Sequence, residues 1–464
     1  MYRHGHIVVT LIAGETLPHV PNHLDCLVGA GRATGRLDGG PIERAIVRWA
    51  GGCRCTGVFH ARRSLGRIGE QHVGFDDLEE RLGLSRTYQI ELATPERTRA
   101  VVGALRDLAQ IETAVEQTLA TVPFAVAPPV RSAIHRLTRD DAERPHHRVR
   151  AAEALAMEPG IEGVTVGIVD SGVALGHEEL QRKLLAGFDT VDLGLGEVGD
   201  GLRLVGDSRG TDFSPRDDAG HGCHVAGVIG AQGWRIPPGI AGHCLLLPIR
   251  VLAGAEIGQT GRRTGVGALP DIDAGLKVCV DLGADVINMS FGTPASLVDP
   301  AGPPPHQAVV RYADLQGCVL VAAAGNSGKR QRFYPSALPE VLAVGSLGED
   351  NRRSSFSTWG DHLALCAPGE RIVSLGRHGY KVSTGTSHAA PFVAGAAALL
   401  VSRAWRRGAR LRGEDVRSLL VRSATPLAPT GFDPEVGYGL LNAAAALEHL
   451  DRAWAAGESL GRST

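Results

Sequence analysis

The stretch that decides the fold of this chain reads Gly385-Thr386-Ser387-His388-Ala389-Ala390-Pro391, and an apolar run over residues 392–400 follows it. It places Ser387 between a glycine-containing segment and a predicted helix. Backbone N–H groups at the start of a helix are unpaired and carry positive partial charge, which suits a nucleophile whose attack creates an oxyanion. The same residues are compatible with an ordinary helix cap, so both interpretations stay open from this stretch alone.

Two earlier segments supply partners for this serine. An apolar run over residues 164–169 ends in Asp170, and His221 opens a second helix of small residues. A serine hydroxyl is a weak nucleophile at neutral pH and needs a base within hydrogen-bond reach, which a histidine can provide. The histidine in turn needs an anion on its other ring nitrogen. In chain order the three residues are Asp170, His221 and Ser387.

This order resembles that of the subtilisin-like serine peptidases (subtilases). Two more family motifs match, at residues 322–328 and 286–292, and the resemblance covers about residues 149–447. It implies that Asp170, His221 and Ser387 form the catalytic triad. It also implies that Asn326 and the Ser387 N–H bind the oxyanion.

The resemblance further implies a primary specificity pocket. Its two walls and its base fall on seven residues, namely Ser290, Phe291 and Gly292, then Ala323, Ala324 and Gly325, and finally Phe333. A phenyl ring at the base would shorten the pocket and keep it apolar, which predicts a preference for small or medium apolar residues before the scissile bond. The alternative is that Phe333 packs into the core and leaves the pocket open.

Two residues depart from the family pattern. Cys223 stands two residues after His221, where threonine is usual, and His388 follows Ser387, where an apolar side chain is common. Neither replaces a catalytic group, so we expect the site to be active. A thiol one helical turn from the base predicts sensitivity to bulky mercurials.

The alternation of strands and helices from residue 163 onward indicates an α/β fold. Apolar runs at 164–169, 245–251, 286–289, 319–323 and 341–344 alternate with helical segments such as 272–282. Continuous apolar strands are buried on both faces, which predicts a mostly parallel sheet with helices on both sides.

The resemblance does not reach the first hundred-odd residues, where the pattern predicts a small α+β domain. We expect strands at 57–62, 87–92 and 111–122 and helices at 75–82 and 95–109, the latter capped by Thr94. The predicted organisation is an N-terminal domain at 1–125, a linker at 126–148, a peptidase domain at 149–450 and a tail at 451–464.

Two roles are open for the N-terminal domain. Subtilases often carry such a domain as a propeptide that assists folding and blocks the cleft, so binding to the cleft in cis is one expectation. The alternative is an unrelated accessory domain. Residues 123–129 are rich in proline and residues 136–150 in charge, which predicts an exposed connector open to self-cleavage.

Composition narrows the partners. The net charge of −2 gives no support for nucleic-acid binding, and no apolar run reaches the roughly 18 residues of a membrane span. Several of the 8 cysteines lie in apolar runs, so we interpret most as free thiols and expect a cytoplasmic location, with secretion as the alternative.

No cofactor is assigned from the sequence. The loop at 230–238 lacks the asparagines of the family's calcium site, and the Asp- and Gly-rich segment 189–218 favours a flexible surface loop over a calcium site. His224 shares a helix face with His221 but has no evident third ligand, so helix packing is favoured. Asp217 and Asp218 are expected to shape the turn before His221.

The predicted function is a serine endopeptidase that cleaves protein or peptide substrates through an acyl-enzyme. One alternative is a dedicated maturation peptidase for a single leader peptide or partner. Another, from a different class, is a catalytically silent peptide-binding scaffold.

Overall fold

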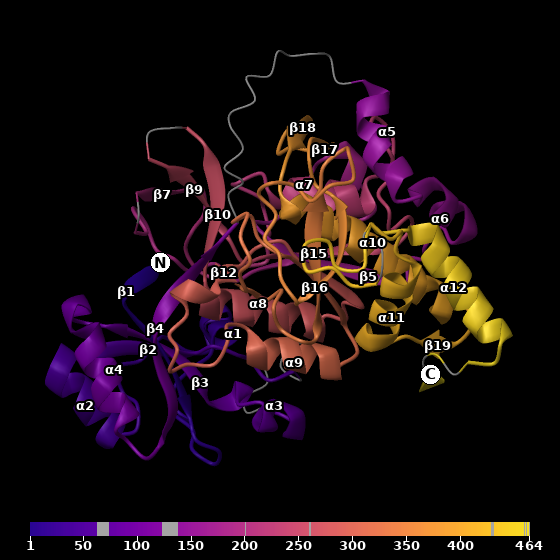
Figure 1. Cartoon of the computed structure of the whole chain (residues 1–464). Helices are drawn as coiled ribbons and strands as arrows, with labels where there is room; N and C mark the ends of the chain where they lie inside the picture. Colours follow the sequence, from indigo (N-terminus) through magenta and orange to yellow (C-terminus); the bar gives the residue numbers. More distant parts are fainter. Residues whose placement is uncertain are drawn as a thin grey trace.

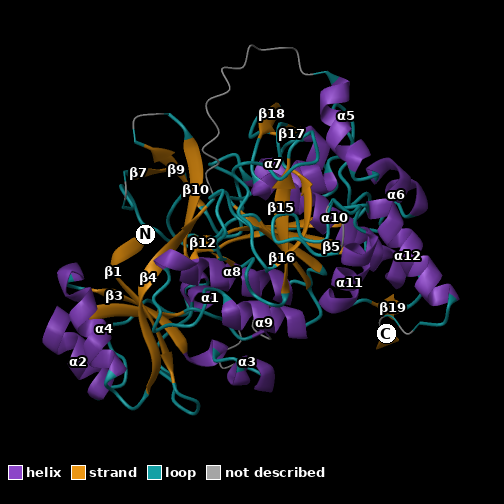
Figure 2. Ribbon diagram, viewed as in Figure 1, coloured by secondary structure: helices purple, strands orange, loops and turns teal. Residues whose placement is uncertain are grey.

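A computed structural model describes residues 1–62, 74–122, 138–199, 201–258, 261–427, 431–458, 460 and 462–463. Two seven-stranded sheets organise these residues, and helices pack around them (Figures 1 and 2). The first is the central parallel sheet of the α/β part. The second runs from the N-terminal region into that part.

The parallel sheet has the order β16-β15-β13-β11-β5-β8-β6. Its strands are β5 (Thr165–Asp170), β6 (Phe188–Asp189), β8 (Leu245–Arg250), β11 (Val286–Met289), β13 (Val319–Ala323), β15 (Val341–Leu347) and β16 (Leu363–Pro368). Nearly every residue of these strands is buried, and all neighbouring pairs are parallel. The α/β fold with a parallel sheet is confirmed.

Helices cover both faces of this sheet. Because side chains alternate along a strand, Val286 joins one apolar cluster and Ile287 the other. The first cluster is covered by α7 (Gly222–Gly230), α10 (Thr386–Trp405), α11 (Gly413–Ser423) and α12 (Ala443–Ala455). The second is covered by α8 (Leu269–Asp281) and α9 (Gln307–Leu315).

The N-terminal region forms four antiparallel strands in the order β2-β3-β1-β4. They are β1 (Tyr2–Leu11), β2 (Cys53–Gly57), β3 (Thr87–Leu92) and β4 (Ile111–Thr121). Two helices, α2 (Pro41–Ala50) and α4 (Thr98–Arg106), pack on the side away from α8 and α9 (Figure 1). Two short helices, α1 (His23–Leu27) and α3 (Asp77–Arg81), complete the region.

Several local predictions for this region need correction. The strand expected at 57–62 is instead β2, which ends at Gly57, and α1 and α2 were not predicted. The helix expected at 95–109 begins as a short 3-10 turn, Pro95–Arg97, before α4. Thr94 does not cap it, because its hydroxyl donates to the Ala50 carbonyl at 3.0 Å.

The N-terminal sheet continues into the α/β part through β4. This strand pairs antiparallel with β10 (Arg263–Ala268), which pairs with β9 (Ala253–Ile257) and then β7 (Leu202–Val205). Four strands from the N-terminal region and three from the α/β part therefore share one sheet.

The segments between and after the predicted domains are more regular than expected. Residues 123–137 lie outside the described residues, but α5 (Arg139–Arg148) and α6 (Ala151–Met157) follow, so the connector expected at 136–150 is largely helical. His146 is buried in α5. The predicted tail at 451–464 begins inside α12, which ends at Ala455, and β20 (Arg462–Ser463) pairs with β19 (Ala409–Arg410).

Candidate active site

Asp170 and His221 meet at the carboxyl edge of the parallel sheet. Asp170 is the last residue of β5 and His221 directly precedes α7, and the distance from His221 Nδ1 to Asp170 Oδ1 is 2.7 Å. Asp170 is fully buried and also accepts a hydrogen bond from the Ser171 N–H at 2.7 Å. A Cβ on Gly222 would lie 2.1 Å from the Gly172 carbonyl oxygen, so only glycine lets α7 approach β5 this closely.

Asp217 fixes the turn that carries His221. Its carboxylate accepts hydrogen bonds from the Gly220 N–H at 2.6 Å, the Cys223 N–H at 2.9 Å and the Ser171 hydroxyl at 2.8 Å. Burial raises the pKa of Asp217, and these donors oppose that shift. The predicted role of Asp217 in shaping this turn is confirmed.

Ser387 is the second residue of α10, so its N–H has no acceptor within the helix. Its side chain is buried, and its hydroxyl donates to the Ser290 carbonyl at 3.1 Å. Among the described residues, His221 Nε2 has no hydrogen-bond partner although it is buried. The hydroxyl is thus turned toward Ser290, and catalytic hydrogen bonds commonly tighten only when substrate is bound.

Asn326 lies beside the start of α10. Its Oδ1 accepts two hydrogen bonds from Thr386, one from the N–H and one from the hydroxyl, both at 2.9 Å. These donors fix the orientation of the amide, because only its oxygen can accept them. The amide nitrogen then faces the segment before Ser387, where a Cβ on Gly385 would lie 3.2 Å from Nδ2.

The predicted pocket residues divide between the site and the core. A Cβ on Gly292 or on Gly325 would each lie 2.8 Å from a ring carbon of Phe333, so this ring is held between the two predicted walls. Ser290 donates its hydroxyl to the Ser387 carbonyl at 3.0 Å. The side chain of Phe291, by contrast, is fully buried and packs edge-on against His306 at 5.8 Å, so it lines the core.

The two remaining wall residues, Ala323 and Ala324, are both buried. Ala323 belongs to the large apolar cluster under α10. Ala324 packs with Ala343, Leu363 and Trp359. Their side chains therefore support the wall from behind.

Cys223 is buried beside Asp217 rather than open to reagents. Its exposure is 0 %, and burial together with the Asp217 charge raises the pKa of its thiol. Thiolate is the reactive form of cysteine, so a buried and protonated thiol reacts slowly. The sequence-based expectation of ready mercurial inhibition is therefore not supported by this environment.

His224 and His388 pack against each other next to the catalytic base. Their ring centroids are 4.2 Å apart, and the His388 ring lies 5.5 Å from that of His221. His224 Nε2 lies 2.9 Å from the Ile372 carbonyl oxygen, so this ring packs in the interior between α7 and β17 (Ile372–Leu375). Burial lowers the pKa of both rings well below the usual range, so both are neutral at pH 7.

The end of β4 reaches the site, although the sequence did not indicate which strand would do so. The Gly292 N–H donates to the Thr121 carbonyl at 3.2 Å, and the Val122 N–H donates to the Gly265 carbonyl at 3.0 Å. Thr121 and Gly292 form an antiparallel bridge. The last residues of β4 therefore lie between β10 and the Ser290–Gly292 segment. Alternation predicted the strand, but no local signal names the partner of a strand.

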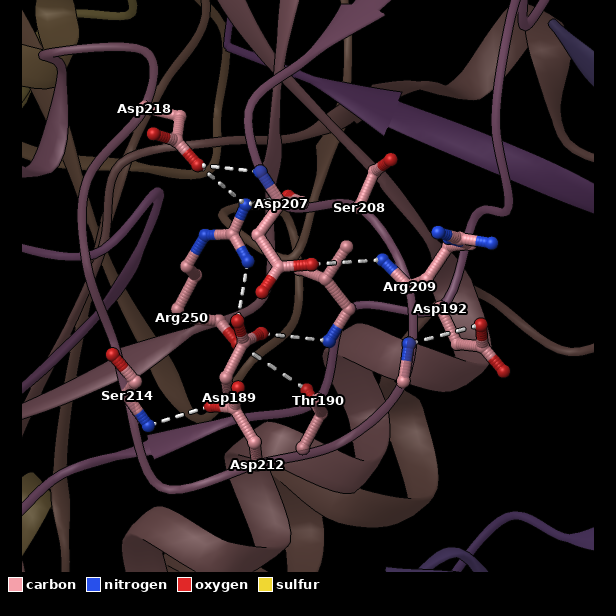
Figure 3. Close-up of polar contacts among 12 residues, drawn as sticks. Asp189, Thr190, Asp192, Asp207, Ser208, Arg209, Asp212, Ser214, Asp218 and Arg250 are labelled. Atoms are coloured by element: carbon pink, nitrogen blue, oxygen red, sulfur yellow. Dashed lines mark hydrogen bonds and ion pairs between the residues drawn. The ribbon is translucent and has the colours of Figure 1, made fainter.

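The segment 189–218 is only in part the surface loop that the sequence favoured. β6 ends at its first residue and β7 lies within it, and Asp189 and Asp218 are both buried around Arg250 (Figure 3). Within the described ranges, no group of three or more His, Cys, Asp or Glu side chains is placed to hold a metal ion. All eight cysteines are free thiols, as expected.

Comparison with known proteins settles the family. The profile of the Subtilase family matches residues 162–439, which is more than half of the chain. The chain belongs to the subtilase family. This family comprises subtilisin-like serine endopeptidases, and the matched range contains Asp170, His221 and Ser387. None of the helices in the described parts of this subtilase has the length and apolar character needed to cross a bilayer.

Curated relatives of this subtilase are serine proteases. It is 33% identical over 276 residues to a thermophilic serine proteinase of Bacillus sp. (strain AK1), with 59% of each chain covered. It is 32% identical over 292 residues to thermitase of Thermoactinomyces vulgaris, covering 61% of this chain and 88% of thermitase. The match to the thermophilic proteinase thus spans less than two thirds of that protein.

The crystal structure of a lanthipeptide protease shares the fold. Its TM-score is 0.53 at 24% identity, with 67% of this chain and 95% of that one covered. At this identity the likeness concerns the fold alone.

Proposed function

We propose that this chain is an active serine endopeptidase with Asp170, His221 and Ser387 as its triad. The observation that carries the proposal is the 2.7 Å contact between His221 Nδ1 and a fully buried Asp170. A buried carboxylate on Nδ1 leaves Nε2 free to take the serine proton, and it stabilises the imidazolium that results.

The reaction proceeds in two steps. Ser387 Oγ attacks the scissile carbonyl while its proton passes to His221, and the Asn326 amide and the Ser387 N–H stabilise the oxyanion. The tetrahedral species collapses to an acyl-enzyme as His221 protonates the leaving amine. His221 then takes a proton from a water molecule as this water attacks the ester. The intermediate collapses to release the acid, and His221 returns the proton to the Ser387 oxygen.

A fluorophosphonate probe tests the nucleophile directly. We expect covalent labelling of the wild-type chain at Ser387 and none in Ser387→Ala. Absence of labelling in the wild type, in a chain that still binds peptides, would favour the silent scaffold instead.

Digestion of casein separates a general endopeptidase from a dedicated maturation peptidase. Broad cleavage supports the general enzyme, whereas labelling without casein cleavage supports the dedicated one. The lanthipeptide protease that shares the fold at 24% identity is compatible with a dedicated maturation peptidase.

For the N-terminal region, we propose the role of a cleft-bound ligand in cis. The support is the β4 strand, whose Thr121 pairs with Gly292 and whose Val122 pairs with Gly265, because an extended peptide that adds a strand is a common mode of substrate recognition. The region would then restrict access to Ser387 until it is displaced or cut. Intact-mass measurement of the expressed chain tests whether it is removed.

The specificity proposed for the site is for small or medium apolar residues before the scissile bond. Its support is the Phe333 ring, which is held between Gly292 and Gly325 and occupies space that a large substrate side chain would need. Profiling with a peptide library tests it.

A further inference from the structure

Arg250 ends β8 at the same edge of the sheet as the proposed triad. In register, it pairs with Asp170 of β5 on one side and with Asp189 of β6 on the other. The side chain of Arg250 is only 1 % exposed. A buried guanidinium is rare and requires paired charges, so its surroundings indicate what it is for.

The guanidinium joins three parts of the 189–218 segment (Figure 3). Nη1 donates to Asp189 Oδ2, and Nη2 donates to the Asp207 carbonyl. Nη2 also lies 3.4 Å from Asp218 Oδ2, which accepts a further hydrogen bond from the Asp207 N–H at 3.0 Å. One cation thus connects a strand end, the middle of the segment and its last residue.

The backbone is shaped to bring Asp218 to this cation. Gly206 has a φ of +77°, and a Cβ there would lie 2.2 Å from the Asp218 carboxyl carbon. The position therefore requires glycine both for its conformation and for the space. Two other arginines reach Asp218 from the surface side, Arg263 at its carbonyl at 3.2 Å and Arg377 at Oδ1 at 3.9 Å, and both are partly exposed.

Asp218 is also the direct neighbour of Asp217. Asp217 holds the Gly220 and Cys223 N–H groups and so sets the turn on which His221 stands. The contacts that hold Asp218 therefore also hold one end of this turn. Burial raises the pKa of Asp189 to about 7, an effect that the Arg250 charge opposes, so loss of Arg250 would favour neutral Asp189 and weaken the assembly further.

We propose that Arg250 is a positioning residue for the catalytic histidine. Its guanidinium supplies the fixed internal cation around which Asp189, Asp207 and Asp218 order the 189–218 segment, and through Asp218 it holds the 217–221 turn in place. The inference rests on the proposed role of His221 as the base. Ser387→Ala separates the two: if that variant loses activity while Arg250 variants behave as wild type, only the inference about Arg250 fails.

The first test replaces the cation with an uncharged side chain of similar length in the full chain, Arg250→Met. Small displacements of a catalytic group cost up to about 100-fold in rate, so we expect kcat and the rate of fluorophosphonate labelling to fall by about 10- to 100-fold with KM little changed. Arg203→Met is the matched control, because it makes the same substitution in the same segment at an exposed arginine that pairs with Glu256. A wild-type kcat in Arg250→Met overturns the proposal.

The second test asks whether charge rather than packing is needed. In Arg250→Ala, millimolar guanidinium should restore part of the labelling rate, and urea at the same concentration should not, since urea has the same planar shape without the charge. Equal effects of the two solutes contradict the proposal. If the Arg250 variants do not fold, Asp218→Ala decides: it leaves the cation in place but removes the side chain that links it to the turn, so kcat should fall, and an unchanged kcat overturns the proposal.

Discussion

The two sheets of this subtilase bury their residues in different ways. The strands of the parallel sheet are buried on both faces and lie between helices of the same domain. The N-terminal strands alternate instead, as in the pattern of β1, and only one face packs on α2 and α4. On the other side, Leu24, Val58 and Phe59 share an apolar cluster with helices α8 and α9. Helices of its own region cover both faces of the parallel sheet, whereas the second side of the N-terminal sheet packs against helices of the other region.

A buried ionic junction joins the two regions. Lys277 of α8 is fully buried and lies 2.6 Å from both Glu79 of the N-terminal region and Asp281 of its own helix. His60 Nε2 lies 3.0 Å from Asp281 Oδ2, and the Tyr312 hydroxyl donates to Asp281 Oδ1 at 2.6 Å. Glu79 and His60 of the N-terminal region thus meet Lys277 and Asp281 of α8 in one buried network. The contrast between the two regions can be tested in four ways.

The largest expected effect is confined to the parallel-sheet region. Ser387→Ala removes the proposed nucleophile, and in subtilisin such a loss costs roughly 2 × 10⁶ in kcat. Peptide hydrolysis should vanish while circular dichroism and the thermal midpoint stay near wild type. If the chain processes itself between residues 123 and 150, a stretch only partly described, this variant should stay full length by mass. Cleavage of the purified variant would show that another protease is responsible.

Asn326→Ala should have the next largest effect. The amide donates to charge that develops only in the transition state, so kcat should fall by about 10²–10³-fold with little change in KM. Steady-state kinetics on a peptide substrate measures both constants. A rise in KM at constant kcat would instead assign Asn326 to ground-state binding.

The dependence of the N-terminal region on the junction is tested by Lys277→Met in the Ser387→Ala chain. With the regions docked, this change leaves Glu79 and Asp281 buried without their cation, and breaking such a pair costs about 3–5 kcal/mol. Amide exchange in β1 and β3 should become faster by at least about 100-fold, while β11 and β13 keep their protection.

Arg99→Ala is the control for that experiment, because Arg99 pairs with Glu116 at the surface, where ion pairs contribute about 0–1 kcal/mol. It should leave exchange unchanged. If amide protection in Lys277→Met falls equally in both sheets, the two regions unfold as one unit and the contrast drawn between them is wrong.

The same contrast explains what the sequence could predict. In the parallel-sheet region, short motifs predict the candidate site residues and continuous apolar runs predict the strands. The predicted strands 286–289 and 319–323 agree with β11 and β13. Asp170 and His221 meet as expected because each ends or begins an element at one sheet edge. The pairing of Thr121 with Gly292 could not be predicted, because alternation fixes which face a side chain takes and not which strand lies alongside.

Contacts between distant segments were missed for the same reason. Nothing local distinguishes Lys277 from a surface cation, since its burial depends on what packs over it, whereas Arg250 lies within the apolar run 245–251. The Asp and Gly content of the 189–218 segment predicts a surface loop, but contacts with the buried guanidinium of Arg250 hold Asp189 and Asp218 inside the protein. The motif predicts that Phe291 lines the pocket. Its side chain instead packs against His306 in the core.

The smallest expected effect lies in specificity, and it should leave the N-terminal region untouched. Phe333 is 9 % exposed, and its ring lies against Gly292 and Gly325, the two predicted walls of the primary pocket. Phe333→Gly removes the ring, so cleavage after Phe and Tyr should rise relative to cleavage after Ala. A difference of one methylene in a pocket changes the preference between substrates by about 10–200-fold. The preference for large over small residues should therefore rise gradually, with Phe333→Leu between the wild type and Phe333→Gly. A peptide library with varied residues before the scissile bond measures it, and amide exchange in β1 should not change because that strand pairs with β3 and β4. A wild-type preference for Phe, Tyr or Arg that persists in Phe333→Gly would show that the ring packs in the core without limiting the pocket.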